Sequence, residues 1–277
     1  MSDAPRGRLQ LKAALPVEMC EPSRAARSTT NGATKAPTSI LLVHGFWTWS
    51  RHWKDAGARL AEAGFSVHAL SLRGHHPDYP IADLGKVHLN DFAEDVIRVA
   101  GEIPGLNCLM GHSLGGLLCM KAAERVPVTR LVLLSPSPPA GVPFRKSPAA
   151  ALGILRHAYE LCAARPMRPD FWIARRTFLL GLPIAKQQEI YRTWIKDSGT
   201  ALREAALANL IIDFSTLRAR ARVVVGSDDN VTPPPAVRRT AELLNAEYKE
   251  YPATGHHLME YPAWPQILND IIQWLSA

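Results

Sequence analysis

The 277-residue chain lacks any apolar run near the roughly 18–20 residues that are needed to cross a bilayer. Its longest apolar runs, such as Ile40–Val43 and Leu131–Leu134, have the length of buried strands. The early segment Leu9–Met19 contains a lysine, a proline and a glutamate, so it has no apolar signal-peptide core. We therefore expect a cytoplasmic protein with no integral membrane association.

Two further absences exclude classes of protein. The four cysteines form no Cys-x-x-Cys pair, and a disulfide framework would be unusual in so long a chain, so we expect reduced thiols. The net charge of +7 is spread along the chain, and no basic run reaches five or six residues. Because binding to phosphates needs clustered charge, we expect no nucleic acid as a partner.

What the sequence does contain, from Ser39 onward, is an alternation of short apolar runs with helical patterns. Apolar strands separated by helices predict an α/β fold with a mostly parallel central sheet and helices on both faces. Right-handed crossovers would place the C-terminal ends of these strands on one rim, where open α/β sheets bind their ligands. The expected strands are Ile40–Val43, Val67–Leu72, Asn107–Met110, Leu131–Leu134, Arg222–Val225 and Glu247–Tyr251, and the expected helices are Trp53–Ala63, Leu89–Ala100, Leu114–Arg125 and Pro262–Leu275.

Two segments interrupt this alternation. Residues 1–38 show no sustained period and are expected to be an N-terminal arm, partly extended or disordered, with an edge strand around Leu9–Met19. Residues 137–217 begin rich in proline and then become helical and aromatic, with no run typical of a strand. We expect this second segment to be a helical cap over the rim, inserted into a core formed by residues 39–136 and 218–277.

The strongest motif is Gly111-His112-Ser113-Leu114-Gly115, which directly follows an expected strand and precedes an expected helix. A G-x-S-x-G sequence in that setting is the nucleophile elbow, a strained turn that exposes the serine hydroxyl. Side chains at Gly111 and Gly115 would collide in so sharp a turn. The alternative is an ordinary glycine-rich turn of a dinucleotide-binding fold, but the spacing does not fit G-x-G-x-x-G.

A serine needs a general base, and the base needs an acid to orient it. The loop after Glu247–Tyr251 contains Gly255-His256-His257, and we favour His256 as the base, with His257 as the alternative. The strand at 222–225 runs into Gly226-Ser227-Asp228-Asp229. We favour Asp229 as the acid, with Asp228 as the alternative, which gives the chain order Ser, Asp, His.

The remaining requirement is an oxyanion hole, a pair of N–H groups that stabilise the negative charge of the transition state. The strand Ile40–Val43 leads into His44-Gly45-Phe46 on the same rim. We expect the backbone N–H groups of Phe46 and Leu114 to form the hole, with His44 bracing the loop.

These motifs, in this order, make residues 39–277 similar to the α/β-hydrolase superfamily of serine hydrolases. The turn Leu70-Ser71-Leu72-Arg73-Gly74-His75 also resembles that of lysophospholipase-like and monoglyceride-lipase-like carboxylesterases, although those often have Gly where this chain has His76. The resemblance implies the α/β-hydrolase fold, with a helical cap inserted after the sixth strand.

The motifs together predict a serine hydrolase that cleaves a carboxylic ester, or a related thioester or lactone, through an acyl-enzyme. Aromatic residues of the cap (Phe171, Trp172, Phe178, Trp194) favour a small to medium apolar substrate. No metal and no organic cofactor is implied. Three alternatives stay open: acyl transfer or cyclisation, a cofactor-free lyase or oxygenase, and a hydrolase-like ligand-binding receptor.

Overall fold

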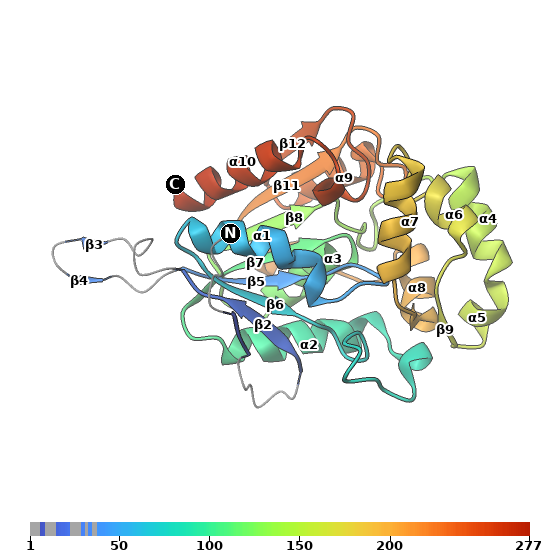
Figure 1. Ribbon diagram of the computed structural model, residues 1–277, viewed down its shortest axis with the longest axis horizontal. Helices are drawn as coiled ribbons and strands as arrows, with labels where there is room; N and C mark the ends of the chain where they lie inside the picture. Colours follow the sequence, from blue (N-terminus) through green and yellow to red (C-terminus); the bar gives the residue numbers. More distant parts are fainter. Residues whose placement is uncertain (1–5, 9–14, 23–28, 31–32, 35–37) are drawn as a thin grey trace.

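The computed structural model describes residues 6–8, 15–22, 29–30, 33–34 and 38–277. Its main feature is an eight-stranded sheet with the order β1-β2-β6-β5-β7-β8-β11-β12 (Figure 1). The strands are β1 (Arg6–Arg8), β2 (Val17–Cys20), β5 (Ser39–Val43), β6 (Ser66–Leu70), β7 (Leu106–His112), β8 (Arg130–Leu134), β11 (Arg220–Gly226) and β12 (Glu247–Tyr251). The strands from β6 to β12 in this order pair in parallel, whereas β1 and β2 are antiparallel to their neighbours. The predicted α/β-hydrolase fold class is thus confirmed.

The sheet begins earlier in the chain than residue 39. Strand β2 overlaps the expected edge strand around Leu9–Met19, but it is not at the edge of the sheet, because it pairs with β6 on one side and with β1 on the other. Residues 9–14 lie outside the described residues, as does most of the expected loop between Ser23 and Thr38. Within that loop the short strands β3 (Thr29–Thr30) and β4 (Ala33–Thr34) form an antiparallel pair.

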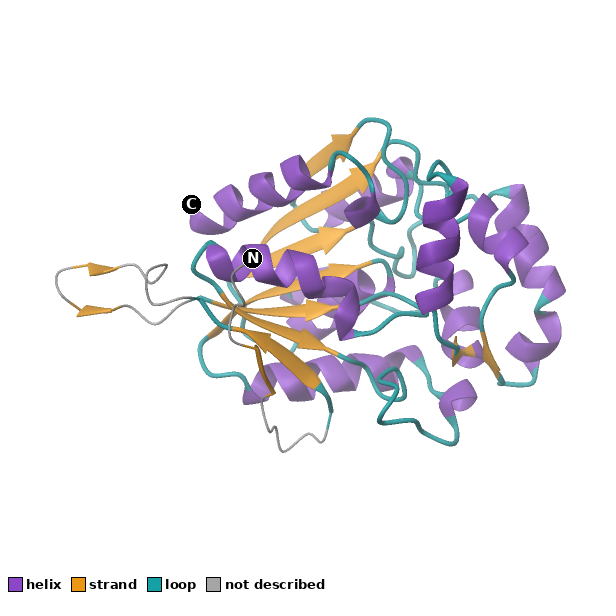
Figure 2. Cartoon of the chain, in the orientation of Figure 1, coloured by secondary structure: helices purple, strands orange, loops and turns teal. Residues whose placement is uncertain are grey.

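Both faces of the sheet are covered by helices because the strand side chains alternate between two apolar layers. Leu41, Leu109 and Leu133 face one layer, and Leu42, Met110 and Leu134 face the other. The first layer is closed by α2 (Leu89–Glu102), α3 (Leu114–Ala123) and α9 (Pro234–Leu243). The second is closed by α1 (Lys54–Glu62) and α10 (Trp264–Ser276), as Figure 2 shows.

The strand order places a natural binding crevice at the ends of β5 and β7. After β5 the chain moves to β6 on one side, and it then returns to β7 on the other side of β5. The loops that leave β5 and β7 therefore diverge to opposite faces of the sheet, which opens a crevice at the C-terminal ends of these strands.

The cap, residues 137–217, leaves the sheet after β8, the sixth strand of the sheet in chain order, and lies beyond the C-terminal ends of the strands (Figure 1). Its α-helices are α4 (Pro148–Arg156), α5 (Ala158–Cys162), α6 (Phe171–Arg176), α7 (Ile184–Thr193) and α8 (Gly199–Ala206). It also contains the strands β9 (Pro166–Met167) and β10 (Asp197–Ser198), which pair antiparallel. The expectation of a strand-free segment was therefore wrong, because two-residue strands are too short to leave a pattern in the sequence.

Short 3₁₀ helices complete the chain: η2 (Ser50–Trp53), η3 (Leu84–Lys86), η4 (Phe214–Thr216) and η5 (Leu258–Glu260). Among the described residues, none of the helices is long and apolar enough to span a membrane.

Candidate active site

Ser113 lies in the turn between β7 and α3 with a strained backbone. Its φ of 53° falls in the left-handed region that residues with a side chain rarely adopt. The neighbouring glycines are required by contact distance: a Cβ on Gly111 would lie 2.2 Å from the carbonyl oxygen of Gly115, and one on Gly115 would lie 2.1 Å from that of Val43. The turn therefore packs backbone against backbone, and it points the Ser113 side chain away from the sheet.

The structure brings Ser113, His256 and Asp229 together at the ends of three strands. His256 Nε2 lies 3.0 Å from Ser113 Oγ, and His256 Nδ1 lies 2.9 Å from Asp229 Oδ2. All three residues are buried. These distances are those of hydrogen bonds, and they run in the order expected of a nucleophile, its base and the acid that orients the base.

The alternatives weighed for the base and the acid lie elsewhere. Asp228 is exposed and accepts a hydrogen bond from the hydroxyl of Ser227. His257 is buried and stacks on the indole of Trp194, with ring centroids 5.7 Å apart. The centroid of its ring is 5.9 Å from that of His256. Among the described residues, the histidine that bonds to Asp229 is His256.

Asp229 is held as a carboxylate by a set of donors. Its Oδ1 accepts from the backbone N–H groups of Val231 and Thr232, both at 2.9 Å, and its Oδ2 accepts from the Thr232 hydroxyl at 2.8 Å. Burial alone would raise the pKa of Asp229, but the charge of His256 and these hydrogen bonds together lower it. An ionised Asp229 keeps the proton of His256 on Nδ1, which leaves Nε2 free to accept the Ser113 proton.

Thr232 did not emerge from the sequence analysis as a site residue. It lies three residues after Asp229, and its hydroxyl contacts both the carboxylate and, at 3.4 Å, His256 Nδ1. The only signal for it in the sequence is its place in the acidic turn before the prolines.

The loop after β5 approaches the serine closely. A Cβ on Gly45 would lie 3.1 Å from Ser113 Cβ, so the next residue, Phe46, presents its backbone beside the nucleophile. Leu114 is the first residue of α3, where a helix leaves its N–H groups without internal partners. In the described part of the chain, neither the Phe46 N–H nor the Leu114 N–H makes a hydrogen bond. Both donors are therefore available to a bound group.

His44 braces this loop as a neutral ring. Its Nδ1 lies 2.8 Å from the carbonyl oxygen of Gly45, and its Nε2 accepts from the backbone N–H of Leu72 at 3.1 Å. Burial, helped by the nearby charge of His75, lowers the pKa of His44 well below its ordinary value. The ring can thus donate from one nitrogen and accept at the other.

A second neutral histidine supports the base from behind. His112 Nε2 lies 2.9 Å from the carbonyl oxygen of His256, so it fixes the backbone of that residue. Burial, together with the charge of His256, lowers the pKa of His112 well below its ordinary value. The same causes lower the pKa of the adjacent His52 to about 4. These rings add no positive charge that would oppose protonation of His256.

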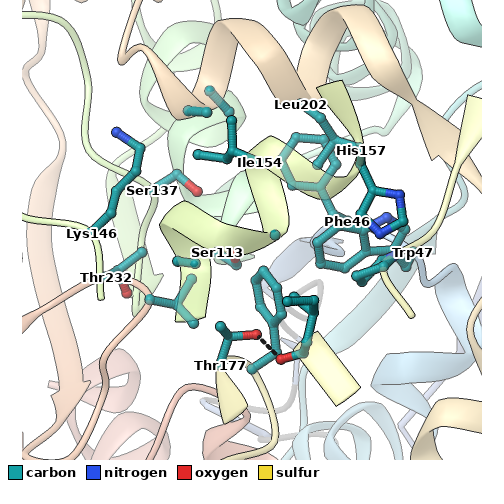
Figure 3. A pocket seen from close by; sticks show the side chains of 18 of the residues that line it. Phe46, Trp47, Ser113, Ser137, Lys146, Ile154, His157, Thr177, Leu202 and Thr232 are labelled. Atoms are coloured by element: carbon teal, nitrogen blue, oxygen red, sulfur yellow. Dashed lines mark hydrogen bonds between the residues drawn. The ribbon is translucent and has the colours of Figure 1, made fainter. Parts of the chain in front are cut away.

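An apolar cavity of about 150 Å³ extends from Ser113 into the cap. Figure 3 shows Phe46 and Trp47 on one side of it and Lys146 and Thr232 on the other. Its far walls come from three cap helices, with Ala150, Gly153 and Ile154 of α4, Ile173 of α6, and Leu202, Ala205 and Ala206 of α8.

The cap aromatics do not all face this cavity as expected. Phe178 lines it, whereas Trp194 is buried against the indole of Trp47, with ring centroids 5.2 Å apart. Trp172 is 40% exposed and stacks beneath the guanidinium of Arg176, and Phe171 packs on Tyr191. Composition alone does not tell which aromatic side chains of this segment turn toward the cavity.

In the part of the chain that the structure describes, there is no cluster of three or more His, Cys, Asp or Glu side chains suited to a metal ion. The rings of His44 and His75 lie 5.0 Å apart, but the ring nitrogens of each are occupied by protein partners.

Comparison with known proteins yields one family. The model of a family described as the alpha/beta hydrolase family matches residues 40–264. The chain is 31% identical over 103 residues to a pimeloyl-[acyl-carrier protein] methyl ester esterase of Aliivibrio fischeri, a match that covers 36% of this chain and 37% of that protein. It is 34% identical over 91 residues to a pyrethroid hydrolase of Sphingobium wenxiniae, covering 32% of each. The match thus spans only about a third of these curated relatives.

Solved structures resemble the chain along almost its whole length. A thermophilic esterase from Thermogutta terrifontis superposes with a TM-score of 0.68 at 20% identity, covering 99% of this chain and 98% of that one. A monoacylglycerol lipase from Paleococcus ferrophilus gives a TM-score of 0.67 at 23% identity, covering 94% and 98%. At such identities the likeness concerns the fold.

Proposed function

The chain belongs to the alpha/beta hydrolase family, and on that basis we propose that it is a serine hydrolase that cleaves a carboxylic ester through an acyl-enzyme. The observation that carries this proposal is the continuous line of hydrogen bonds from Asp229 through His256 to Ser113. We also propose that residues 39–136 and 218–277 act as the catalytic core, while residues 137–217 act as a cap that selects the substrate.

In the proposed reaction, Ser113 Oγ attacks the acyl carbon while His256 Nε2 takes its proton. The imidazolium that forms is stabilised by the ionised Asp229. The carbonyl oxygen becomes an oxyanion, and the N–H groups of Phe46 and Leu114 donate to it. His256 then returns the proton to the leaving alcohol, and a water molecule, activated by the same base, releases the acid from Ser113.

The apolar cavity supports an acyl group of small to medium length as the part of the substrate that enters the cap. Its walls are mostly aliphatic and aromatic, and burial of each methylene there stabilises the complex by about 0.8 kcal/mol. A thioester or lactone with the same acyl group would use the same residues. The proposed partner is therefore a small ester-type molecule.

Labelling with a fluorophosphonate tests the proposed chemistry. We expect the folded protein to gain one phosphonyl group, and peptide mass spectrometry should find it on Ser113, because an activated serine beside an oxyanion hole attacks phosphorus readily. Protein unfolded in urea should not react. A folded protein that stays unlabelled would contradict the proposed function.

The proposed acyl site predicts a dependence on chain length. We expect kcat/KM for p-nitrophenyl esters to rise from acetate to butyrate and hexanoate. Leu202→Trp would shorten the cavity and lower kcat/KM for hexanoate relative to acetate by about tenfold, the typical effect of a lost or added methylene contact. Leu207→Trp is the matched control, because Leu207 follows the same helix but is 63% exposed. A wild-type preference for acetate would contradict the assignment of the cavity.

A further inference from the structure

The cap binds the oxyanion loop at one residue, Trp47. Trp47, which directly follows Phe46, donates its backbone N–H to Asp197 Oδ2 at 2.9 Å. Its carbonyl oxygen accepts from the backbone N–H of Ile195 at 2.9 Å. Both polar groups of the Trp47 backbone are therefore bound by the cap segment 195–197, across about 150 residues of sequence.

Trp47 needs such a restraint because of its backbone conformation. Its φ of 63° lies in the left-handed region that favours glycine and that bulky residues rarely adopt. Without the contacts from the cap, the residue would be expected to relax toward a negative φ. Such a rotation would turn the peptide unit that joins Phe46 to Trp47, and with it the backbone of Phe46.

Asp197 is itself fixed by a buried cation. Its Oδ2 also contacts His75 Nε2 at 2.7 Å, and both side chains are fully buried. His75 Nδ1 lies 3.1 Å from the carbonyl oxygen of Arg73. Since the partner of each ring nitrogen can only accept, both nitrogens carry hydrogen and the ring is an imidazolium. Burial opposes this charge, but Asp197 and the hydrogen bonds outweigh burial and raise the pKa of His75.

We propose that Asp197, held by His75, is a positioning residue that sets the Trp47 peptide and thereby aims the Phe46 N–H into the oxyanion hole. The cap thus completes the hole in addition to lining the acyl cavity. This inference rests on the proposed function, because it assigns a role within the same site.

The cap segment is also held to the core by hydrogen bonds that do not involve the Asp197 carboxylate. The next residue, Ser198, donates its hydroxyl toward the carbonyl oxygens of Gly85 and Val87, at 3.1 and 2.6 Å. Thr200 donates its hydroxyl to Gly85 at 2.8 Å. These bonds anchor the segment independently, so a change at Asp197 should act on the loop rather than release the cap.

Asp197→Asn tests the proposal. One oxygen of the carboxylate accepts from Trp47 and His75, and the other accepts from the Ser198 N–H. An amide has a single acceptor oxygen, so its NH₂ group must face the donors on one of these two sides. We expect kcat for p-nitrophenyl butyrate to fall by about ten- to a hundredfold, less than the loss of a whole oxyanion donor. KM should change by less than about threefold, because the acyl cavity is intact.

Inhibitor binding separates positioning from a loss of structure. An alkyl trifluoromethyl ketone, which forms an oxyanion on Ser113, should lose affinity by the same factor as kcat/KM, since it resembles the transition state. The matching alkyl alcohol, which forms no oxyanion, should bind as before. Asp270→Asn is the control, because Asp270 lies in α10 with Lys249 and Tyr251 as partners and should leave both affinities unchanged.

His75→Gln provides an independent variant in case Asp197→Asn does not fold. It removes the cation while keeping a neutral donor beside Asp197, and the same parallel loss of kcat and ketone affinity is expected. Kinetics and ketone affinity within twofold of the wild type in a folded variant would overturn the proposal, as would equal losses for the ketone and the alcohol. A wild-type protein that no fluorophosphonate labels would instead refute the proposed function itself.

Discussion

Ser113→Ala is expected to lower kcat for p-nitrophenyl butyrate by about four to six powers of ten, the range found when a triad serine is removed. His256 Nε2 has the Ser113 hydroxyl as its partner at 3.0 Å, so removing that hydroxyl removes the group that the base would activate. The oxyanion donors belong to the backbone of Phe46 and Leu114, so they should survive the change and leave a small residual rate. Steady-state hydrolysis, with the released p-nitrophenol followed by absorbance, measures the effect.

Ser135→Ala is the matched control for this experiment. Ser135 directly follows the neighbouring strand β8, is fully buried and also has a positive φ, of 43°, but its hydroxyl has no hydrogen-bond partner among the described residues. We expect this variant to retain wild-type activity. A further check is the double variant Ser113→Ala/His256→Ala, which should be no slower than Ser113→Ala, since the two residues act as one unit. Activity within tenfold of the wild type in Ser113→Ala would contradict the assignment of the nucleophile.

The core of the fold was predictable because its signals are local. The apolar run at 40–43 forms all of β5 except its first residue, and the runs at 131–134 and 222–225 lie within β8 and β11. Ser113 lies directly after β7, and Asp229 and His256 lie in the loops that follow β11 and β12, so chain order and strand order together predicted that they share one rim. The glycines of the elbow were predictable from their motif, although only one of the two clashes is local: a Cβ on Gly111 would meet Gly115, whereas one on Gly115 would meet Val43 of β5.

The rest of the site depends on contacts between distant parts of the chain. His75 and Asp197 are 122 residues apart, and no spacing in the sequence marks them as a pair. The cap aromatics illustrate the same limit, because Phe178 faces the cavity while Trp172 faces solvent. The expected edge strand around Leu9–Met19 overlaps β2, but β1 was not predicted, because three residues give too little alternation to define a strand.

Under the proposed function, these long-range contacts would give the cap two connections to the reaction. Its helices α4, α6 and α8 form the walls that an acyl group would touch, and its strand β10 supplies Asp197 to the oxyanion loop. We therefore expect sequence changes on different elements of the cap to alter the choice of substrate and the rate of reaction separately.

Asp229→Asn is expected to lower kcat by about three to four powers of ten while the protein remains folded, as is found when a triad aspartate becomes an amide. The carboxylate has two acceptor oxygens for four donors, and one of these donors is His256 Nδ1. The amide would turn its NH₂ group toward either the ring or the backbone N–H groups. Where it faces the ring, His256 is expected to move its proton to Nε2, and that nitrogen can no longer accept from Ser113.

The neighbouring Asp228→Asn makes the same chemical change outside the hydrogen-bond line, because Asp228 is exposed and pairs with Ser227. We expect its kcat to equal that of the wild type, and the reverse result for the two variants would exchange the roles of the two aspartates.

The pH dependence of stability should also depend on the Asp229 carboxylate. The pKa of Asp229 is lowered in the folded chain, so its carboxylate stabilises the fold above its ordinary pKa of 3.8, and that contribution is lost as the pH falls through the lower folded value. Asn does not titrate, so the difference in unfolding free energy between wild type and Asp229→Asn should shrink below pH of about 4, as measured by urea denaturation. A difference that stays constant across this range would mean that Asp229 is not held as a carboxylate, and the mechanism would then lack the charge that stabilises the His256 imidazolium.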